Sequence, residues 1–411
     1  APGTPWTLAD CIAHAQQNNT QVQQRQLQVE RSDIELSTAR YSRLPDLNAS
    51  IGGDASFGRA LTSDNTYRNN NQTSGSLNVS ASMPLFQGMR INHQIKAGKL
   101  DLAAAIEDLE RIREDVAINV MTLYLQVLYS KEMVGVAERQ LELSTQQALR
   151  SRELAAAGKQ PESAVYESEA LAANDRMTLT QSRNDLQLAL LDLSQALNRE
   201  SAAGFDIVEP VLDSVALETL HHLGNPDAVY AYAAENRPHI RAEKLRLESS
   251  EHAVDVARSA LYPTLSLSGG YGTGVYSADD SKFWAQMRHN SREYVGLSLG
   301  IPIFNRRATR NNIRTARIAV RSQQLAVTEA ERALRKEIEQ AWYNADAAFA
   351  SAEVAFSYEQ AKAEAGRSTV FDFNDAKTRM EKAAAEAVQA KYEFVFRSKI
   401  LDFYRGEPLR L

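Results

Sequence analysis

The chain has 411 residues, of which 44% are hydrophobic and 24% are charged, a balance typical of a folded protein rather than a disordered one. Its 46 basic and 52 acidic residues give a net charge of -6, which provides no basic field for nucleic acid, and one cysteine excludes an internal disulfide framework. No stretch reaches about 18 predominantly apolar residues, so no transmembrane helix is predicted. The sequence starts with Ala-Pro-Gly and has no initial Met, and we expect a processed chain from which an export signal has been removed.

The helical parts of the sequence are unusually long. The first predicted helix begins at Thr7, where Asp10 completes a capping-box pattern, and it is expected to run to about Tyr41. A second helix is predicted from about Met89 to Leu149, because apolar residues recur there at spacings of three, four and seven. At 1.5 Å per residue this helix is roughly 90 Å long, so it must pack laterally against other rods.

Between these helices, and again later in the chain, segments of about ten residues alternate strictly between apolar and polar residues. The predicted strands lie at about 47–58, 74–86, 264–276 and 293–304, and polar loops at 62–72 and 277–292 separate them. Such alternation is typical of membrane-spanning β-strands with one face to lipid and one to water. The predicted lipid-facing residues are Val79, Leu85, Leu265, Leu267, Leu297 and Leu299.

Alternating strands also occur in soluble antiparallel sheets with one buried face. The alternative function is therefore a soluble or surface-anchored scaffold of long helices, in which the hairpins are only packing elements. If the strands span a membrane, four are too few, because the smallest membrane barrels have eight. Open sheet edges are not tolerated in lipid, so several chains must pool their strands: two chains give eight and three give twelve.

The chain is a tandem duplication. Residues 18–124 align without a gap on residues shifted by 218 positions, and among the matches Leu27 falls on Leu245 and Pro84 on Pro302. Beyond this region the offset changes, and Gly158 best matches Gly366. We predict a first repeat at 1–200, a linker at 201–224 and a second repeat at 225–411, which begins with Asn225 as a helix cap before Pro226.

Paired motifs at the strand ends give the duplicated pattern a family resemblance. Before the strands stand Ala39-Arg40 with Pro45-Asp46-Leu47 and Ala257-Arg258 with Pro263-Thr264-Leu265, and after them Pro84-Leu85-Phe86 and Pro302-Ile303-Phe304. In these motifs the chain resembles the TolC family of bacterial outer-membrane efflux proteins.

The resemblance implies a mainly α fold with a transmembrane β-barrel in the bacterial outer membrane. The expected assembly is a homotrimer with a twelve-stranded barrel in outer-membrane lipid, a long periplasmic α-helical barrel, and an equatorial region formed by the linker at 201–224 and the chain ends. The implied function is a passive export duct of a tripartite efflux or type I secretion system. Its expected partners are a periplasmic adaptor (membrane fusion) protein and an inner-membrane transporter.

The two helix–turn–helix tips are the candidate docking and gating sites. Gly158 with Pro161, and Gly366 with Ser368, mark turns where the resemblance places adaptor docking. In the same way it implies a periplasmic gate made by Asp372, Asp375 and Arg367, in which three chains would form rings of carboxylates that draw cations. A helix-cap interpretation of Thr369 and Asp372 remains open.

Other chemistry is not indicated. The seven histidines are scattered, and no catalytic set, cofactor site or metal site is predicted, so the chain is not expected to be an enzyme. The glycine-rich stretch at 269–274 lies inside a strand pattern, where we expect it to keep the barrel lumen clear of bulk.

Overall fold

The computed structural model describes residues 5–61, 65–69, 71–210, 225–277, 279, 281–363, 370–407 and 409. Its first half contains α1 (Leu8–Asn18), α2 (Thr20–Tyr41), β1 (Asp46–Ser56), β2 (Arg59–Leu61), β3 (Tyr67–Asn69), β4 (Gln72–Gln87), α3 (Arg90–Ala156) and α4 (Glu162–Ala196). The second half contains α6 (Pro226–Asn236), α7 (Pro238–Ser259), β5 (Thr264–Tyr276), α8 (Phe283–His289), β6 (Arg292–Gly300), α9 (Ala308–Ala363) and α10 (Val370–Tyr404). The order of the main elements is therefore the same in both halves.

The chain divides into two compact units, each built from both halves. The helical unit comprises residues 1–28, 106–242 and 328–411, and the sheet unit comprises residues 29–105 and 243–327. The units cut across the sequence repeats, so the division at 201–224 stays a prediction about duplication.

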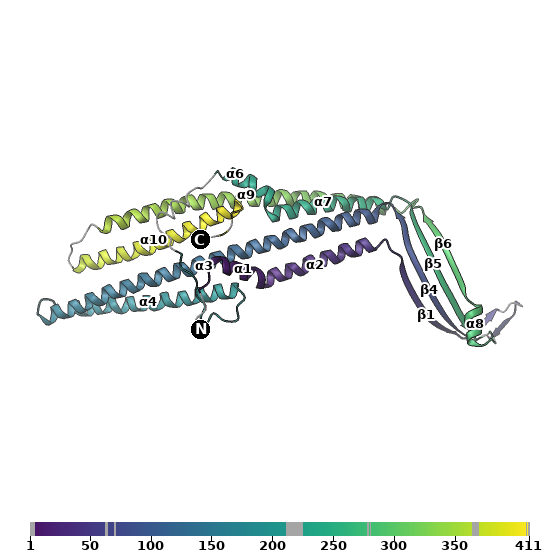
Figure 1. Ribbon diagram of the computed structural model, residues 1–411, viewed down its shortest axis with the longest axis horizontal. Helices are drawn as coiled ribbons and strands as arrows, with labels where there is room; N and C mark the ends of the chain where they lie inside the picture. Colours follow the sequence, from purple (N-terminus) through teal and green to yellow (C-terminus); the bar gives the residue numbers. More distant parts are fainter. Residues whose placement is uncertain are drawn as a thin grey trace. The chain divides into compact units, whose positions relative to one another are not determined.

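The sheet unit contains one four-stranded antiparallel sheet with the strand order β1-β4-β5-β6 (Figure 1). All four strands lie where alternation predicts them, with ends that differ by a few residues. The antiparallel pairing of β4 with β5 joins strands from the two halves of the chain, so the duplicated strand pairs form a single sheet.

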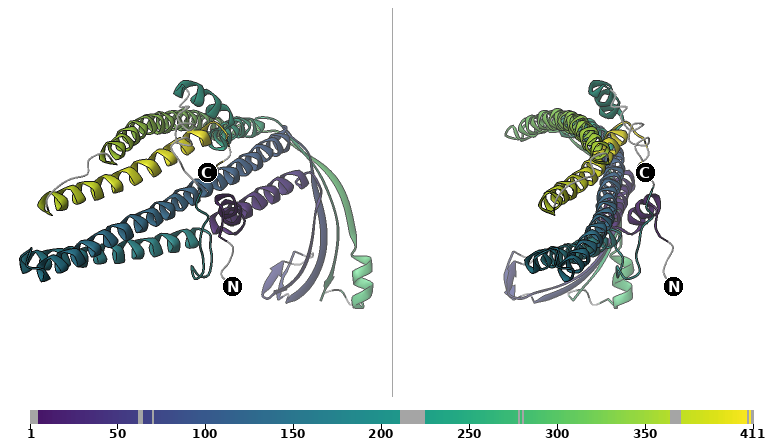
Figure 2. Two further views of the ribbon diagram at one scale, coloured as in Figure 1. Left: turned by 60° about the vertical axis from the view of Figure 1, so that its left-hand side comes forward. Right: turned by 90° about the vertical axis from the view of Figure 1, so that its left-hand side faces the viewer.

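In the helical unit, α3 and α4 form one antiparallel hairpin, and α9 and α10 form another (Figure 2). The middle of the predicted apolar face of α3 is buried, with Val120 and Val127 fully inaccessible and Tyr124 only 2% exposed. A second core cluster joins α6, α7 and α9 through Ala233, Ile240 and Ile338. Lateral packing thus buries part of the apolar surface of the long helices, whereas Ile106 of α3 and Ile318 and Leu325 of α9 are exposed in the chain.

The prediction of one continuous helix from Thr7 to about Tyr41 is wrong, because the structure has two helices there, α1 and α2. The capping box at Thr7 and Asp10 is present, but the chain leaves the helical conformation at Asn19 (φ -66°, ψ 129°) and starts α2 at Thr20. The Asn19 side chain accepts a hydrogen bond from the Gln21 backbone N–H (2.8 Å) and thereby caps the new helix. The residue that matches Thr20 in the second half is Pro238, where the same break occurs.

Two predicted loops contain regular structure. Part of the 62–72 loop forms β3, which pairs with β2 in a separate two-stranded sheet, and the 277–292 loop contains α8. Short elements of this kind have too few residues to show a clear period.

Cys11 lies in α1 and is fully buried. Burial raises the pKa of its thiol to about 12, so the side chain remains a neutral, small apolar group at physiological pH.

Two glycines with positive φ terminate or start the long helices. Gly158 (φ 67°) ends α3 in a Schellman motif. In this motif the Gly158 N–H donates to the Ala155 carbonyl oxygen and the Lys159 N–H donates to the Leu154 carbonyl oxygen. Gly88 (φ 58°) precedes α3, and a Cβ there would lie 2.6 Å from the Ser259 carbonyl oxygen. At Gly158 a Cβ would meet nothing within 4 Å.

This pair gives a matched test of packing at the junction between sheet and helices. Gly158→Ala should cost only the left-handed backbone strain, about 1–2 kcal/mol of unfolding free energy. Gly88→Ala should cost about 1–3 kcal/mol more, because the added methyl also collides with backbone. Thermal unfolding of both variants in detergent measures the difference. Equal losses would show that the close approach at Gly88 is absent.

Candidate functional site

The sheet has one apolar and one polar face, because its register places the apolar residues of neighbouring strands opposite one another. In antiparallel sheets directly paired residues share a face, and the pairing runs from Leu47 through Ala81 and Gly269 to Val295. Other residues of this face are Ala49, Ile51, Leu77, Val79, Leu265, Leu267, Leu297 and Leu299. Many of these side chains are exposed, among them Ile51 (86%) and Leu297 (68%). The described chain therefore leaves the apolar face uncovered over much of its area.

Leu85 differs from the other predicted lipid-facing residues. The pairing of β4 with β5 slips between Pro84 and Phe86, so that Phe86 pairs with Leu265 and Leu85 has no partner across the ladder. Such a β-bulge moves the following residue to the other face of the strand. Phe86 therefore takes the place on the apolar face that simple alternation assigns to Leu85.

The opposite face is polar and partly filled by an aromatic ring. Asn78 pairs with Gly272, and Ser80 pairs with Gly270, which in turn pairs with Tyr294. A Cβ at Gly270 would lie 2.7 Å from the Tyr294 ring and 2.8 Å from the Val79 carbonyl oxygen. The glycine thus makes room for the tyrosine, so at this position the expectation that glycines keep the face clear of bulk is wrong.

The sheet has two open edges in the described chain. The strand order places β1 and β6 at the ends, and each has a neighbouring strand on one side only. Their outward backbone N–H and C=O groups need partners outside the sheet wherever water is absent.

The end of the sheet near α8 is closed by a buried glutamine. Gln286, only 5% exposed, accepts a hydrogen bond from the Tyr276 N–H (2.7 Å) and donates to the carbonyl oxygens of Asp279 (2.7 Å) and Ser281 (2.9 Å). Thr273 donates to the Met287 carbonyl oxygen (2.6 Å). These bonds hold α8 against β5. Part of the predicted loop at 277–292 is therefore an ordered helix.

The predicted tip of the first helical hairpin is well defined. After the Schellman motif at Gly158, Pro161 occupies the N-cap of α4 in an extended conformation, and its carbonyl oxygen accepts from the Ala164 N–H (3.1 Å). The two residues together produce a tight reversal between α3 and α4.

The predicted second tip lies between α9 and α10. Gly366, Arg367 and Ser368 lie outside the described residues. Asp372 and Asp375 belong to the first turns of α10 by their backbone, and their side chains lie outside the description.

The first part of the 201–224 segment is fixed to the helical unit. Trp6 and Ile207 form a parallel bridge, and the Lys131 ammonium group lies 2.6 Å from Asp206 and 3.0 Å from Glu209. Burial by itself lowers the pKa of Lys131, but the two carboxylates outweigh it and raise that pKa above its ordinary value. Residues 211–224 lie outside the described part.

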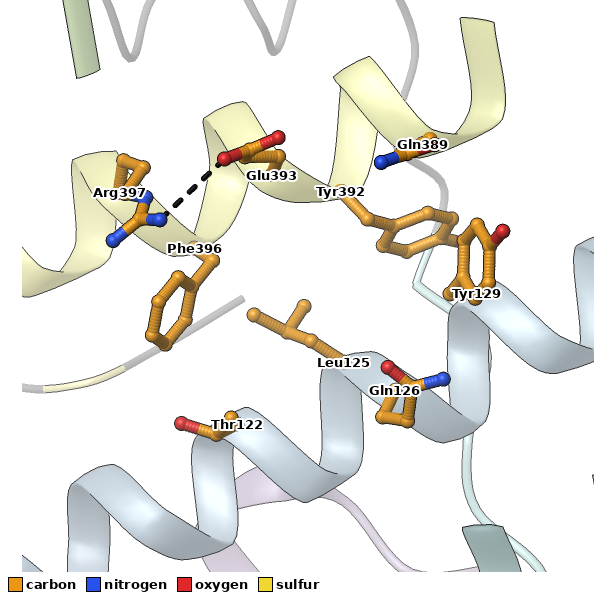
Figure 3. Close-up of a pocket in the computed structure, with 9 residues that line it drawn as sticks. All are labelled: Thr122, Leu125, Gln126, Tyr129, Gln389, Tyr392, Glu393, Phe396 and Arg397. Atoms are coloured by element: carbon orange, nitrogen blue, oxygen red, sulfur yellow. Dashed lines mark hydrogen bonds and ion pairs between the residues drawn. The ribbon is translucent and has the colours of Figure 1, made fainter. Parts of the chain in front are cut away.

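A groove with a volume of about 390 Å³ lies between α3 and α10 in the helical unit (Figure 3). Leu125 and Tyr129 line it from α3, and Tyr392, Phe396 and Arg397 line it from α10. Figure 3 shows the Arg397–Glu393 ion pair on one wall of the groove and the rings of Tyr129 and Tyr392 at the other end. The two tyrosine rings pack edge to face, with their centroids 6.3 Å apart. The lining combines aromatic rings and amides with a paired charge, so it is suited to packing rather than to bond-breaking chemistry.

The sequence and the fold of this chain are similar to those of known outer-membrane proteins. The family model described as outer membrane efflux protein matches residues 11–199 and 229–406. The outer membrane efflux protein BepC of Brucella suis is 22% identical over 407 residues, which cover 96% of this chain and 84% of that protein. The pyoverdine export outer membrane protein OpmQ of Pseudomonas aeruginosa is 26% identical, covering 64% of this chain and 54% of OpmQ. The crystal structure of the Campylobacter jejuni CmeC outer membrane channel has a TM-score of 0.77 at 18% identity and covers 97% of this chain and 85% of that one.

The family match and the relatives place this sheet with its exposed apolar face, and the paired long helices, among the channel proteins of the bacterial outer membrane. The chain belongs to the outer membrane efflux protein family, since the family model matches most of its length. It is an outer-membrane export channel component, and the alternative of a soluble helical scaffold is set aside by this membership. Members of this family are channel proteins rather than enzymes. Within the described part of the chain, every helix is too short or too polar to cross a lipid bilayer.

Proposed function

We propose that three copies of this chain form a passive export duct whose twelve strands close a barrel in the outer membrane. The observation that supports the proposal is the sheet itself, with an exposed apolar face, a polar face and two open edges. Joining β1 of one copy to β6 of the next would pair both edges and turn the apolar face toward lipid. The long helices would continue the duct as a periplasmic tunnel.

In this proposal the helical tips face the periplasm. The turn at Gly158 and Pro161, and its counterpart at Gly366 and Ser368, would dock a periplasmic adaptor that connects the duct to an inner-membrane transporter. The relatives named above support an export role for the duct, because their names contain the words efflux or export together with outer membrane. Rearrangement of the tips would open the duct, with Arg367 as an ion-pair partner in the closed form.

The particle mass tests the assembly directly. Extraction from outer-membrane fractions in mild detergent should give three chains of 45.6 kDa, about 137 kDa of protein, by light scattering that corrects for detergent. A monomer or dimer of otherwise folded chain would contradict the twelve-stranded barrel.

The lipid-facing assignment has a matched test on one strand. Leu297 pairs with Leu267 on the apolar face, whereas its neighbour Ser298 pairs with Ser266 on the polar face. Leu297→Arg should cost roughly 2–4 kcal/mol if the residue faces lipid near the bilayer midplane, and the yield of heat-resistant trimer in the membrane should fall. Ser298→Arg should leave that yield close to the parent value. A reversed or equal response would show that the faces are assigned wrongly.

The carboxylate gate has a control in the other half of the chain. Asp375 corresponds to Glu167 at the offset of 208. Changing Asp372 and Asp375 together to Asn should move the K⁺/Cl⁻ permeability ratio toward one, because two rings of negative charge are removed from a constriction. Reversal potentials in planar bilayers under a KCl gradient measure the ratio. Glu167→Gln should have a smaller effect, and unchanged selectivity in the double variant would exclude the gate.

A further inference from the structure

His93 of α3 meets His252 and Asp255, which lie one turn apart on α7, in the sheet unit. The Nδ1 atoms of His93 and His252 are 3.5 Å apart, and His93 Nδ1 lies 3.7 Å from Asp255 Oδ2. One ligand atom from each of the three side chains lies within 4.8 Å of the others. All three residues are half-buried, so the cluster is held by the fold and remains open to small solutes.

We propose that His93, His252 and Asp255 bind a divalent transition-metal ion of the zinc type. Zinc bonds to histidine nitrogen at about 2.0–2.1 Å and to carboxylate oxygen at about 2.0–2.2 Å, so the ligand atoms of a tetrahedral site are roughly 3.3–3.5 Å apart. The separations of His93 Nδ1 from His252 Nδ1 and from Asp255 Oδ2 are within a few tenths of an ångström of that spacing. Small side-chain rotations therefore suffice to form the site.

The carboxylate is already oriented for this role. Arg258 Nη1 donates to Asp255 Oδ1 at 3.1 Å, which leaves Oδ2 directed at His93. Hydrogen bonds to the ligating groups are a regular feature of metal sites because they fix ligand orientation. The positive charge of Arg258 opposes the ion, and three protein ligands leave a fourth position for water, so exchangeable binding is expected rather than a permanently closed structural site.

Metal-free, the same atoms form a poorer set of contacts. A hydrogen bond between the two Nδ1 atoms needs a proton on one of them, and their separation of 3.5 Å is long for such a bond. An ion replaces that proton and satisfies both nitrogens and Oδ2 at once. Its physical effect would be a cross-link between α3 and α7, because those helices supply all three ligands.

The duplication shows that the fold does not require this cluster. At the offset of 218, His93 corresponds to Asn311, while His252 and Asp255 correspond to Ile34 and Ser37. The equivalent positions on α9 and α2 therefore carry apolar and neutral side chains in place of the cluster. The cluster is a feature of α3 and α7 alone, and Asn311, Ile34 and Ser37 are natural replacements for its three residues.

The test uses the full chain, purified in detergent without a polyhistidine tag, with Co²⁺ and Zn²⁺ as probes. Co²⁺ should produce visible absorption bands of the intensity typical of four-coordinate sites, and Zn²⁺ titration calorimetry should give one ion per chain. Zn²⁺ should also raise the thermal unfolding temperature, because it binds the folded chain.

The variants His93→Asn and Asp255→Ser take the residues found at the matching positions of the other repeat, Asn311 and Ser37. Each should weaken Zn²⁺ binding by at least about tenfold and abolish the Co²⁺ bands. The control His239→Ala removes another histidine of α7, which contacts Arg111, and should bind like the parent. Absent Co²⁺ bands in the parent, or parent-like Zn²⁺ binding by both cluster variants while their unfolding without metal is unchanged, would overturn the proposal.

Discussion

Backbone hydrogen bonding at the two edges of the sheet is the constraint on which the architecture depends. Each described chain leaves β1 and β6 with one neighbouring strand, and a lipid bilayer offers no partner for the remaining N–H and C=O groups. The apolar face has the same consequence, since its exposed leucines and valines are stable only against lipid or another protein surface. In the proposed trimer, closure of the strands between copies would remove both problems together.

The duplicated chain is more than a means of supplying four strands. Both halves keep the order helix, strand, strand, long helix and returning helix, which is the part that closure requires. They differ where packing places no such demand. The first half has Ala164 and Glu167 where the second has Asp372 and Asp375, and the histidine cluster draws two of its ligands from α7 alone. Duplication therefore fixes the scaffold and leaves tips and helix surfaces free to acquire separate functions.

Much of this fold follows from local periodicity, and the exceptions have identifiable physical reasons. Strands with period two and helices with period 3.6 are long here, so their signals accumulate over many residues. The break at Asn19 was missed because one capping side chain decides it, and α8 and β3 were missed because they are short. The bulge at Leu85 depends on pairing with β5, some 180 residues later in the chain. Sites follow the same rule: the tip at Gly158 is local and was predicted, whereas His93 and His252 meet only through tertiary packing.

The tight turn at the first tip limits how the proposed duct could open. The turn between α3 and α4 is closed by the two hydrogen bonds of the Schellman motif and by the fixed φ of Pro161, so it is a poor hinge. In the proposed duct, opening would then move this tip as a rigid unit, through small changes spread along the helices, which bend gently over many turns. A metal ion between α3 and α7 would act at the opposite end of α3 from this tip. It would hold the helix near the strands, where closure requires a fixed register, and leave the distant tip free to move.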